Sequence, residues 1–289
     1  MGRDYRRVLF NGDCIPSRRN PQSLLDAAGT EHAPAAGRAR IVSLVPSLTE
    51  LLFDLGLGPR VVGRTAFCVH PEAGVRAVPS VGGTKKVNME KLMALRPTHA
   101  ILNVDENPEA MAGELERLGV QVIVTHPIEA ADNLGLFRLL GGVFGREKEA
   151  AALARRFEKS LASLRAAARG APPKRALYLI WKEPWMTVAA DTYIARFLAL
   201  IDWRCVGAGE PGKRYPEIIL AEPLLAQTDL VLFATEPYAF TQADVADFKA
   251  RFPAHAHKAR LVDAELLSWY GSRAIEGLDY LARLLASEA

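Results

Sequence analysis

The chain has 289 residues, of which 49% are apolar and 24% are charged, a composition typical of globular proteins. Its 36 basic and 33 acidic residues leave a net charge of +3, which gives no reason to expect nucleic acid or an anionic membrane as a partner. The three cysteines, Cys14, Cys68 and Cys205, form no recognisable disulfide framework, and no apolar run approaches the roughly 18 residues of a membrane-spanning helix.

Residues 1–37 carry no periodic apolar pattern, and we expect them to form a loosely ordered extension. The opening stretch MGRDYRRVLF is charged, but the apolar run of about 7 to 15 residues that a secretory signal needs does not follow it. The chain as written therefore predicts a cytoplasmic protein.

From residue 41 onward, short apolar strands alternate with helices. The strand at 41–45 leads into a predicted helix. Ser47 with Glu50 three residues later has the spacing of a capping box and predicts the start of that helix. Asn88 is expected to cap another helix. Further strands are expected at RVVG (60–63), HAILNV (99–104) and VQVIVTH (120–126). This alternation predicts a parallel α/β sheet.

A long helix and a second α/β segment follow. Four apolar residues recur at three- and four-residue spacing and indicate one buried helix face: Leu153, Phe157, Leu161 and Leu164. Strands are expected at RALYLIW, DLVLFA and ARLVDA. We therefore predict an α/β fold with an extension (1–37), an N-terminal lobe (38–145), a connecting helix (146–170) and a C-terminal lobe (171–289).

The two α/β segments share one sequence feature. Glu90 opens the pentapeptide EKLMA before the strand at 99–104, and Glu222 opens EPLLA before the strand at 229–234. Each glutamate falls in the first turn of a short helix that leads into a strand. We expect the two glutamates to occupy equivalent positions in the two lobes.

Catalytic and cofactor motifs are weak in this sequence. GAGEPG at 207–212 matches G-x-G-x-x-G, but Pro211 and the following KRYPE disfavour the helix that must receive a pyrophosphate. Neither a G-x-S-x-G elbow nor an H-E-x-x-H motif occurs. We therefore predict that the protein is not an enzyme; the alternative is a hydrolase with Cys68 as nucleophile and His70 or His126 as base.

Aromatic side chains gather in loops and at predicted strand ends. Ligands of open α/β sheets bind outside the carboxyl ends of the strands, so these residues predict an aromatic-walled cleft between the lobes. The alternative is that they close the lobe interface. They are Phe67, Trp181, Trp185, Met186, Tyr215, Trp269 and Tyr270.

The order of elements and several motifs resemble the class III ABC-transporter substrate-binding proteins, which have a helical backbone. Within that group the chain is most similar to vitamin B12-binding proteins, from about Arg40 to the C-terminus. The resemblance is carried by RIVSLVPSLTELLFDLG, VNMEKLMALRP, LERLGVQVIV, the long helix, EPWMTVAADTYI and RYPEIILAEPLLAQ.

The resemblance implies two Rossmann-like α/β lobes joined by one long helix, with a ligand cleft between them. Phe67 stands where the B12 binders have a stacking tyrosine, and Tyr215 where they have a tryptophan before proline. Trp185 and Met186 lie in another contact loop, while Thr84 replaces a ring-contacting tryptophan. The predicted ligand set consists of these residues together with Cys68, His70 and Trp269.

The resemblance also implies a partner and a location. Glu90 and Glu222 match two glutamates that contact arginines of the membrane permease. The family expectation is a periplasmic protein, which we expect to be a monomer with no intrinsic cofactor.

The segment FCVHP, residues 67–71, has two interpretations. A metal site would need further ligands besides Cys68 and His70; the candidates are His126, Asp105 or Glu106, and Glu183. Alternatively the loop forms a pocket rim, and His70 is an axial ligand to the metal of a haem or corrinoid.

The sequence thus favours a binding protein for a metal chelate, cobalamin or corrinoid-like, that delivers its ligand to an ABC importer. The alternative is a cytoplasmic receptor for a metal, haem or metallocofactor that is not coupled to a transporter. The Cys68 hydrolase is the third hypothesis.

Overall fold

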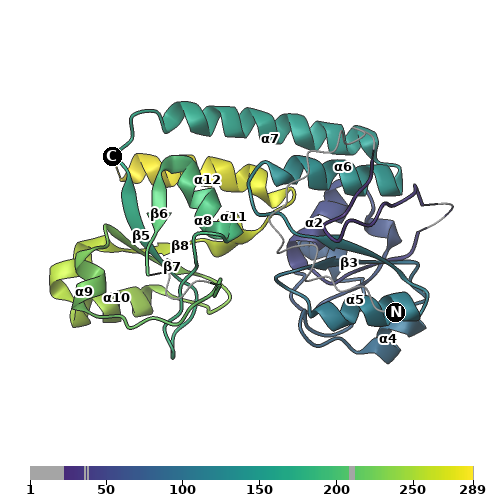
Figure 1. Ribbon diagram of the computed structural model, residues 1–289, viewed down its shortest axis with the longest axis horizontal. Helices are drawn as coiled ribbons and strands as arrows, with labels where there is room; N and C mark the ends of the chain where they lie inside the picture. The colour runs from purple at the N-terminus through teal and green to yellow at the C-terminus, as the bar shows by residue number, and fades with distance from the viewer. Residues whose placement is uncertain (1–22, 36, 38, 208–211, 289) are drawn as a thin grey trace. The chain divides into compact units, whose positions relative to one another are not determined.

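The computed structural model describes residues 23–35, 37, 39–207 and 212–288 (Figure 1). Cys14 and the centre of the GAGEPG match lie outside the described residues. The chain divides into two units. The first comprises the chain up to Pro127, Ala131–Arg155 and Tyr270–Ser272, and the second comprises Ile128–Ala130, Arg156–Trp269 and the chain from Arg273.

The first unit contains a parallel sheet in the order β2-β1-β3-β4. Its strands are β1 (Ile41–Ser43), β2 (Val61–Arg64), β3 (His99–Asn103) and β4 (Gln121–Thr125). Every residue of β1 and β3 is buried, as expected for parallel strands covered on both faces. The predicted alternation of strands and helices is confirmed for this unit.

Helices cover both faces of the first sheet. They are α2 (Pro46–Asp54), η1 (Gly58–Arg60), α3 (Glu72–Val75), α4 (Met89–Ala94), α5 (Glu109–Arg117) and α6 (Asp132–Phe144). Figure 1 shows α4 and α5 on one side of the sheet and α2 and α6 on the other. Leu92 of α4 and Leu115 of α5 share a core cluster with Val42, Ala100 and Val122 of the strands.

Two predicted helix caps have different outcomes. Asn88 caps α4, since its side chain accepts a hydrogen bond of 2.8 Å from the Lys91 backbone nitrogen. The predicted cap at Ser47 was wrong: the N-cap residue of α2 is Val45, two residues earlier, and the helix begins at Pro46. Proline is pre-organised for the first helical position because its φ angle is fixed near the helical value.

The long helix α7 (Glu147–Ala167) runs from the first unit into the second, because the division falls between Arg155 and Arg156. The predicted buried face is confirmed for Leu153, Phe157, Leu161 and Leu164. No helix among the described residues is long and apolar enough to cross a membrane.

The second sheet repeats the topology of the first, in the order β6-β5-β7-β8. Its strands are β5 (Lys174–Leu179), β6 (Trp203–Cys205), β7 (Leu230–Ala234) and β8 (Ala259–Val262). Its helices are α8 (Tyr193–Leu198), η2 (Ala199–Ile201), α9 (Glu222–Ala226), α10 (Gln242–Arg251), η3 (Pro253–Lys258), α11 (Ala264–Ser268) and α12 (Arg273–Ser287). The two sheets confirm the predicted α/β fold, although the three-residue strand β6 was not foreseen.

Residues 23–35 do not form a loosely ordered extension, so for them the prediction was wrong. The Ala27 backbone nitrogen donates to the Val124 carbonyl oxygen on β4 (2.9 Å), and the Val124 nitrogen donates to Asp26 Oδ2 (3.0 Å). Asp26 also accepts from two backbone nitrogens within its own loop and lies 3.0 Å from His32 Nε2. This segment, which we call the strap, is fixed to β4 by the Ala27 backbone and by the buried Asp26 carboxylate, whose side chain is 1% exposed.

Candidate functional site

The loop after β2 presents an aromatic side chain at the carboxyl edge of the first sheet. Phe67 is 61% exposed and Val69 46% exposed, whereas Cys68 between them is fully buried. Phe67 lies over Gly83, where an added Cβ atom would come within 3.4 Å of the ring. The predicted stacking residue of this unit is therefore open to solvent.

Cys68 has a packing role. Thr49 Oγ1 donates a hydrogen bond of 3.0 Å to its thiol, and Thr65 Oγ1 lies 3.1 Å from the same sulfur. Burial raises the pKa of the Cys68 thiol, and the threonine hydrogen bonds lower it less. Because a nucleophilic cysteine reacts as the thiolate, this environment disfavours the hydrolase hypothesis. His70 is half-buried in the same loop, and its role as an axial ligand stays a prediction.

Asn107 connects the end of β3 to two other loops of the first unit, and sequence reasoning missed this role. Its amide nitrogen donates to the carbonyl oxygens of Leu44 (3.1 Å) and Thr84 (2.9 Å). Its amide oxygen accepts from the Asn103 backbone nitrogen at 2.8 Å. Thr84 is thus held through its backbone, and its side chain is half-buried; its role as a ligand contact stays a prediction.

Acidic side chains follow β3 at the same sheet edge. Asp105 Oδ2 lies 3.7 Å from Nε2 of His126, which follows β4. Glu106 Oε1 accepts a hydrogen bond of 2.5 Å from the Tyr270 hydroxyl. Burial, together with the nearby Glu106 carboxylate, raises the pKa of Tyr270 well above its ordinary value. Tyr270 is therefore a neutral donor that fixes Glu106.

The described residues contain no group of three or more histidine, cysteine, aspartate and glutamate side chains that could hold a metal ion. Within the described residues of the first unit, Cys68 and His70 are therefore not joined by His126, Asp105 or Glu106 in a site for a bare ion.

The predicted ligand residues of the second unit divide between core and surface. Trp185 is half-buried, stacks on Phe240 with ring centroids 5.9 Å apart, and meets Phe233 edge-on. Tyr215 is 37% exposed. Trp181, which follows β5, is 40% exposed. Of the two tryptophans in this loop, Trp181 offers more free surface, while Trp185 belongs to the core.

Trp269 is buried, and its indole nitrogen donates a hydrogen bond of 2.6 Å to Glu236 Oε1. Ser268 Oγ donates to the same oxygen at 3.1 Å, and the Arg273 guanidinium lies 5.7 Å from the Trp269 ring centroid. Burial raises the pKa of the Glu236 carboxyl, and the two hydrogen bonds lower it less. Glu236 was missed in the sequence, where its signal is an acid two residues after the strand DLVLFA.

The two glutamates predicted to dock a partner lie in the first turns of α4 and α9. Since α4 precedes β3 and α9 precedes β7, the matching sheet orders show that Glu90 and Glu222 begin topologically equivalent helices, as the second residue of α4 and the first of α9. Both are exposed; Glu222 Oε1 also lies 2.7 Å from Nε2 of the buried His255.

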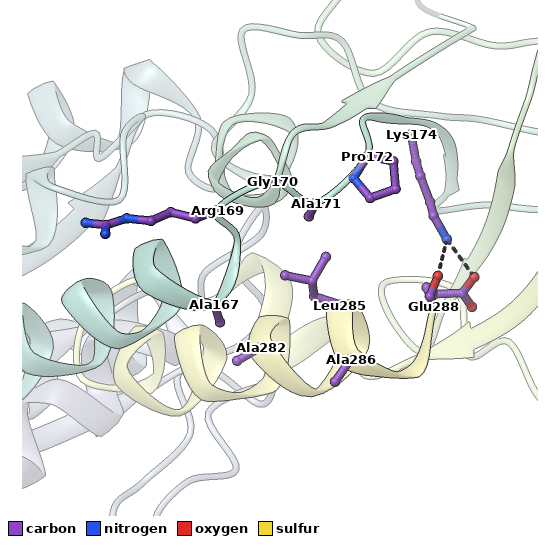
Figure 2. A pocket seen from close by; sticks show the side chains of 10 residues that line it. All are labelled: Ala167, Arg169, Gly170, Ala171, Pro172, Lys174, Ala282, Leu285, Ala286 and Glu288. Atoms are coloured by element: carbon purple, nitrogen blue, oxygen red, sulfur yellow. Dashed lines mark hydrogen bonds and ion pairs between the residues drawn. The ribbon is translucent and has the colours of Figure 1, made fainter.

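A cavity of about 330 Å³ lies in the second unit between the end of α7 and the last turns of α12 (Figure 2). The ion pair of Lys174 and Glu288, 3.0 Å long, closes one end of it. The cavity lies where β5 begins, whereas Trp181 follows the end of that strand. None of the predicted ligand residues lines it.

Comparisons with known proteins agree with this fold. The family model described as periplasmic binding protein matches residues 41–257. The vitamin B12-binding protein of Yersinia pestis (strain Pestoides F) is 24% identical over 209 residues, which cover 68% of this chain and 74% of that protein.

Two solved structures are similar to the whole fold. The periplasmic vitamin B12-binding protein BtuF of Vibrio cholerae gives a TM-score of 0.76 at 19% identity, over 86% of this chain and 98% of that one. A periplasmic haem-binding protein from Pseudomonas aeruginosa gives 0.73 at 25% identity, over 87% and 94%.

Proposed function

The chain belongs to the periplasmic binding protein family, and from this premise we propose that it binds a planar metal chelate and delivers it to an ABC importer. The relatives support a ligand of this class, because those named above bind vitamin B12 or haem according to their names. A corrinoid such as cobalamin is the first candidate and haem the second. The protein itself carries no intrinsic cofactor in this proposal.

The exposed aromatic residues at the carboxyl edges of the two sheets carry the proposal. Phe67 follows β2 of the first unit and is 61% exposed, and Tyr215 of the second unit is 37% exposed. Aromatic rings that are exposed beside the strand ends of an open α/β sheet are suited to binding a ligand there, because each ring offers a large apolar face. Flat apolar rings are suited to stacking on the face of a corrin or porphyrin. The predicted cleft between the lobes stays a prediction.

His70 favours a ligand that carries a metal. It lies in the same loop as Phe67, three residues further along the chain, and is half-buried. Imidazole is an axial ligand to iron in haem proteins and also suits cobalt. His70 is therefore the residue that we propose as an axial ligand in either complex.

We place this function in the periplasm, which is where the family name locates its members. The cytoplasmic location expected from the sequence has no support from the relatives. That expectation depended on the first residues of the chain, and residues 1–22 lie outside the described part.

Ligand titration tests the proposal. Cyanocobalamin and hemin are added separately to the purified protein, with tryptophan fluorescence and native mass spectrometry as readouts. We expect a one-to-one complex with quenched fluorescence. Phe67→Ala should weaken binding about tenfold, because an aromatic contact contributes roughly 1 kcal/mol beyond its buried area. Leu118→Ala, an exposed apolar residue at the end of α5, is the control.

Two results would change the proposed ligand. If neither chelate binds while Zn²⁺ strongly raises the melting temperature, the protein is a receptor for a bare metal ion. If His70→Ala leaves the visible spectrum of a bound chelate unchanged, His70 is not an axial ligand.

A further inference from the structure

One of the two glutamates predicted to dock a partner is held by a histidine of its own unit. Glu222 is the first residue of α9, and its Oε1 atom lies 2.7 Å from Nε2 of His255 in η3. The Glu222 side chain is 68% exposed, whereas the His255 side chain is only 9% exposed. An exposed carboxylate is thus fixed at one oxygen by a buried imidazole.

Packing alone does not account for a histidine at position 255. The Nδ1 atom of His255 is buried and has no hydrogen-bond partner among the described residues. A buried polar atom without a partner lowers stability, and a leucine would fill a similar volume without that loss. What the histidine supplies and a leucine lacks is the Nε2 contact with Glu222.

The chemistry of the pair sets the direction of this hydrogen bond. An ionised carboxylate only accepts hydrogen bonds, so His255 Nε2–H is the donor. A hydrogen bond with one ionised partner is roughly twice as strong as one between neutral groups. In the described part of the chain, Glu222 makes no other side-chain hydrogen bond or ion pair, so its Oε2 atom is open to a cationic group from outside.

The short helix η3 also supports α9 at its other end. Lys258 Nζ donates a hydrogen bond of 2.8 Å to the Leu225 carbonyl oxygen, near the C-terminal end of α9. Lys258 therefore holds the backbone of α9, while His255 holds the side chain of Glu222. Because these two contacts are separate, a substitution at His255 should release the carboxylate and leave the helix in place.

Glu90, the docking glutamate of the first unit, is not held in this way. Its helix α4 is capped by the Asn88 side chain, which accepts from the Lys91 backbone nitrogen. Among the described residues, the Glu90 carboxylate itself has no hydrogen bond or ion pair. The two units thus present one carboxylate in a fixed orientation and one that is free to rotate.

A fixed carboxylate should bind a partner more tightly than a rotating one. Ordering a long polar side chain during association costs free energy, because its rotamer freedom is lost. The contact with His255 restricts Glu222 before any partner arrives, so this loss is smaller in the association step. The typical size of the effect for one side chain corresponds to about a threefold to tenfold difference in affinity.

We propose that His255 is a positioning residue for docking: it orients Glu222 so that Oε2 meets an arginine of the importer. This inference rests on the proposed function, in which an ABC importer is the partner. It adds that the second unit offers a preformed contact, whereas the contact made by Glu90 is adaptable.

Variants of two histidines in η3 test this role. His255→Leu removes the donor, and His255→Gln keeps one, because its side-chain amide nitrogen can donate to Glu222. His257→Leu changes an exposed histidine of the same helix and is the matched control. The ATPase activity of the cognate importer in proteoliposomes is measured against the concentration of protein loaded with cyanocobalamin or hemin.

We expect His255→Leu to raise the concentration for half-maximal stimulation about threefold to tenfold and to leave the maximal rate unchanged. His255→Gln should recover most of this loss, and His257→Leu should behave as the wild type does. Adding His255→Leu to Glu222→Ala should have no further effect, because the histidine acts through that carboxylate. An equal further loss in the Glu222→Ala background would show that His255 contributes only to packing.

A measurement without the importer tests the contact itself. The imidazole nitrogen signals of His255 are compared by NMR in the wild type and in Glu222→Ala, and the Nε2 signal should shift. This comparison applies even if His255→Leu does not fold, and an unchanged signal would overturn the inference. If the importer responds equally to the wild type and every His255 variant, the inference is wrong and the proposed function stands. If the wild type binds a chelate and stimulates no importer, the delivery function and this inference are both wrong.

Discussion

Trp269 and Tyr270 are consecutive residues, and each donates a hydrogen bond to a glutamate that follows the corresponding strand of a different sheet. Trp269 bonds to Glu236 after β7 at 2.6 Å, and Tyr270 bonds to Glu106 after β3 at 2.5 Å. The chain passes from the second unit to the first between these two residues. Both sides of that crossing are therefore fixed by a buried aromatic donor.

The first prediction concerns Tyr270. Tyr270→Phe keeps the ring but removes the donor to Glu106, so the free energy of unfolding should fall by about 1 to 3 kcal/mol. Urea unfolding followed by circular dichroism measures this. Tyr238→Phe is the matched control on a half-buried tyrosine. Equal stability of Tyr270→Phe and the wild type would show that the hydrogen bond contributes nothing.

The second prediction concerns the pH dependence of stability. Burial raises the pKa of Glu236 in the folded protein, so the folded state holds this proton more tightly than the unfolded chain does. The resulting contribution to stability is present below the ordinary pKa of glutamate and is lost as pH rises through the raised value. Melting temperatures of the wild type should therefore decline across that window more steeply than those of Glu236→Gln.

The comparison uses melting curves from about pH 4.5 upward to about pH 7.5, where an ordinary glutamate is largely ionised. Glu217→Gln, at an exposed position, is the control and should keep the wild-type slope. Identical slopes for Glu236→Gln and the wild type would contradict the raised pKa of Glu236.

The third prediction concerns the strap. Asp26 accepts hydrogen bonds from the backbone nitrogens of Val124, Ala28 and Thr30, and its side chain is 1% exposed. Asp26→Ala leaves these buried donors unpaired, so unfolding should become easier by about 3 kcal/mol or more. Glu31→Ala, at an exposed position in the same segment, should change stability by less than about 0.5 kcal/mol. Thermal unfolding of both variants tests this, and equal melting temperatures would show that the strap is not held by Asp26.

The strap also shows what the sequence could not predict. Local periodicity in the sequence predicts the strands and helices of residues 41–179. The buried face of α7, for example, is indicated by Leu153 and Phe157 at four-residue spacing. Residues 23–35 have no such period, because they are held by contacts with β4 nearly a hundred positions later in the chain. A local sequence pattern does not predict contacts between residues that are so far apart in the chain.

The candidate site was predicted in part for a similar reason. The positions of Phe67 after a strand, and of Glu90 and Glu222 before equivalent strands, could be predicted from the order of elements along the chain. The separation of Trp181 from Trp185 could not, because apolar residues lie on both faces of the paired segments 180–182, 185–187 and 215–219, which hides the two-residue alternation of an extended segment. Only the pairing of Met186 with Trp181 and Glu217 assigns each tryptophan to a face.

The last prediction concerns docking of the proposed permease. Glu90 and Glu222 are exposed carboxylates in the first turns of α4 and α9, at equivalent positions of the two units. Negative charge is favoured at a helix N-terminus, and a carboxylate can accept two parallel hydrogen bonds from an arginine. Because a single charge at an interface rim changes on-rate more than affinity, the double variant is the informative one.

Glu90→Ala combined with Glu222→Ala should leave chelate binding unchanged and abolish stimulation of the cognate importer's ATPase in proteoliposomes. Glu109→Ala, in the first turn of α5, is the matched control and should stimulate as the wild type does. His255→Ala should reduce stimulation less than the double variant, because it releases the Glu222 carboxylate without removing it. Full stimulation by the double variant would show that these glutamates do not dock the transporter, and the chain would then act as a receptor that is not coupled to one through this surface.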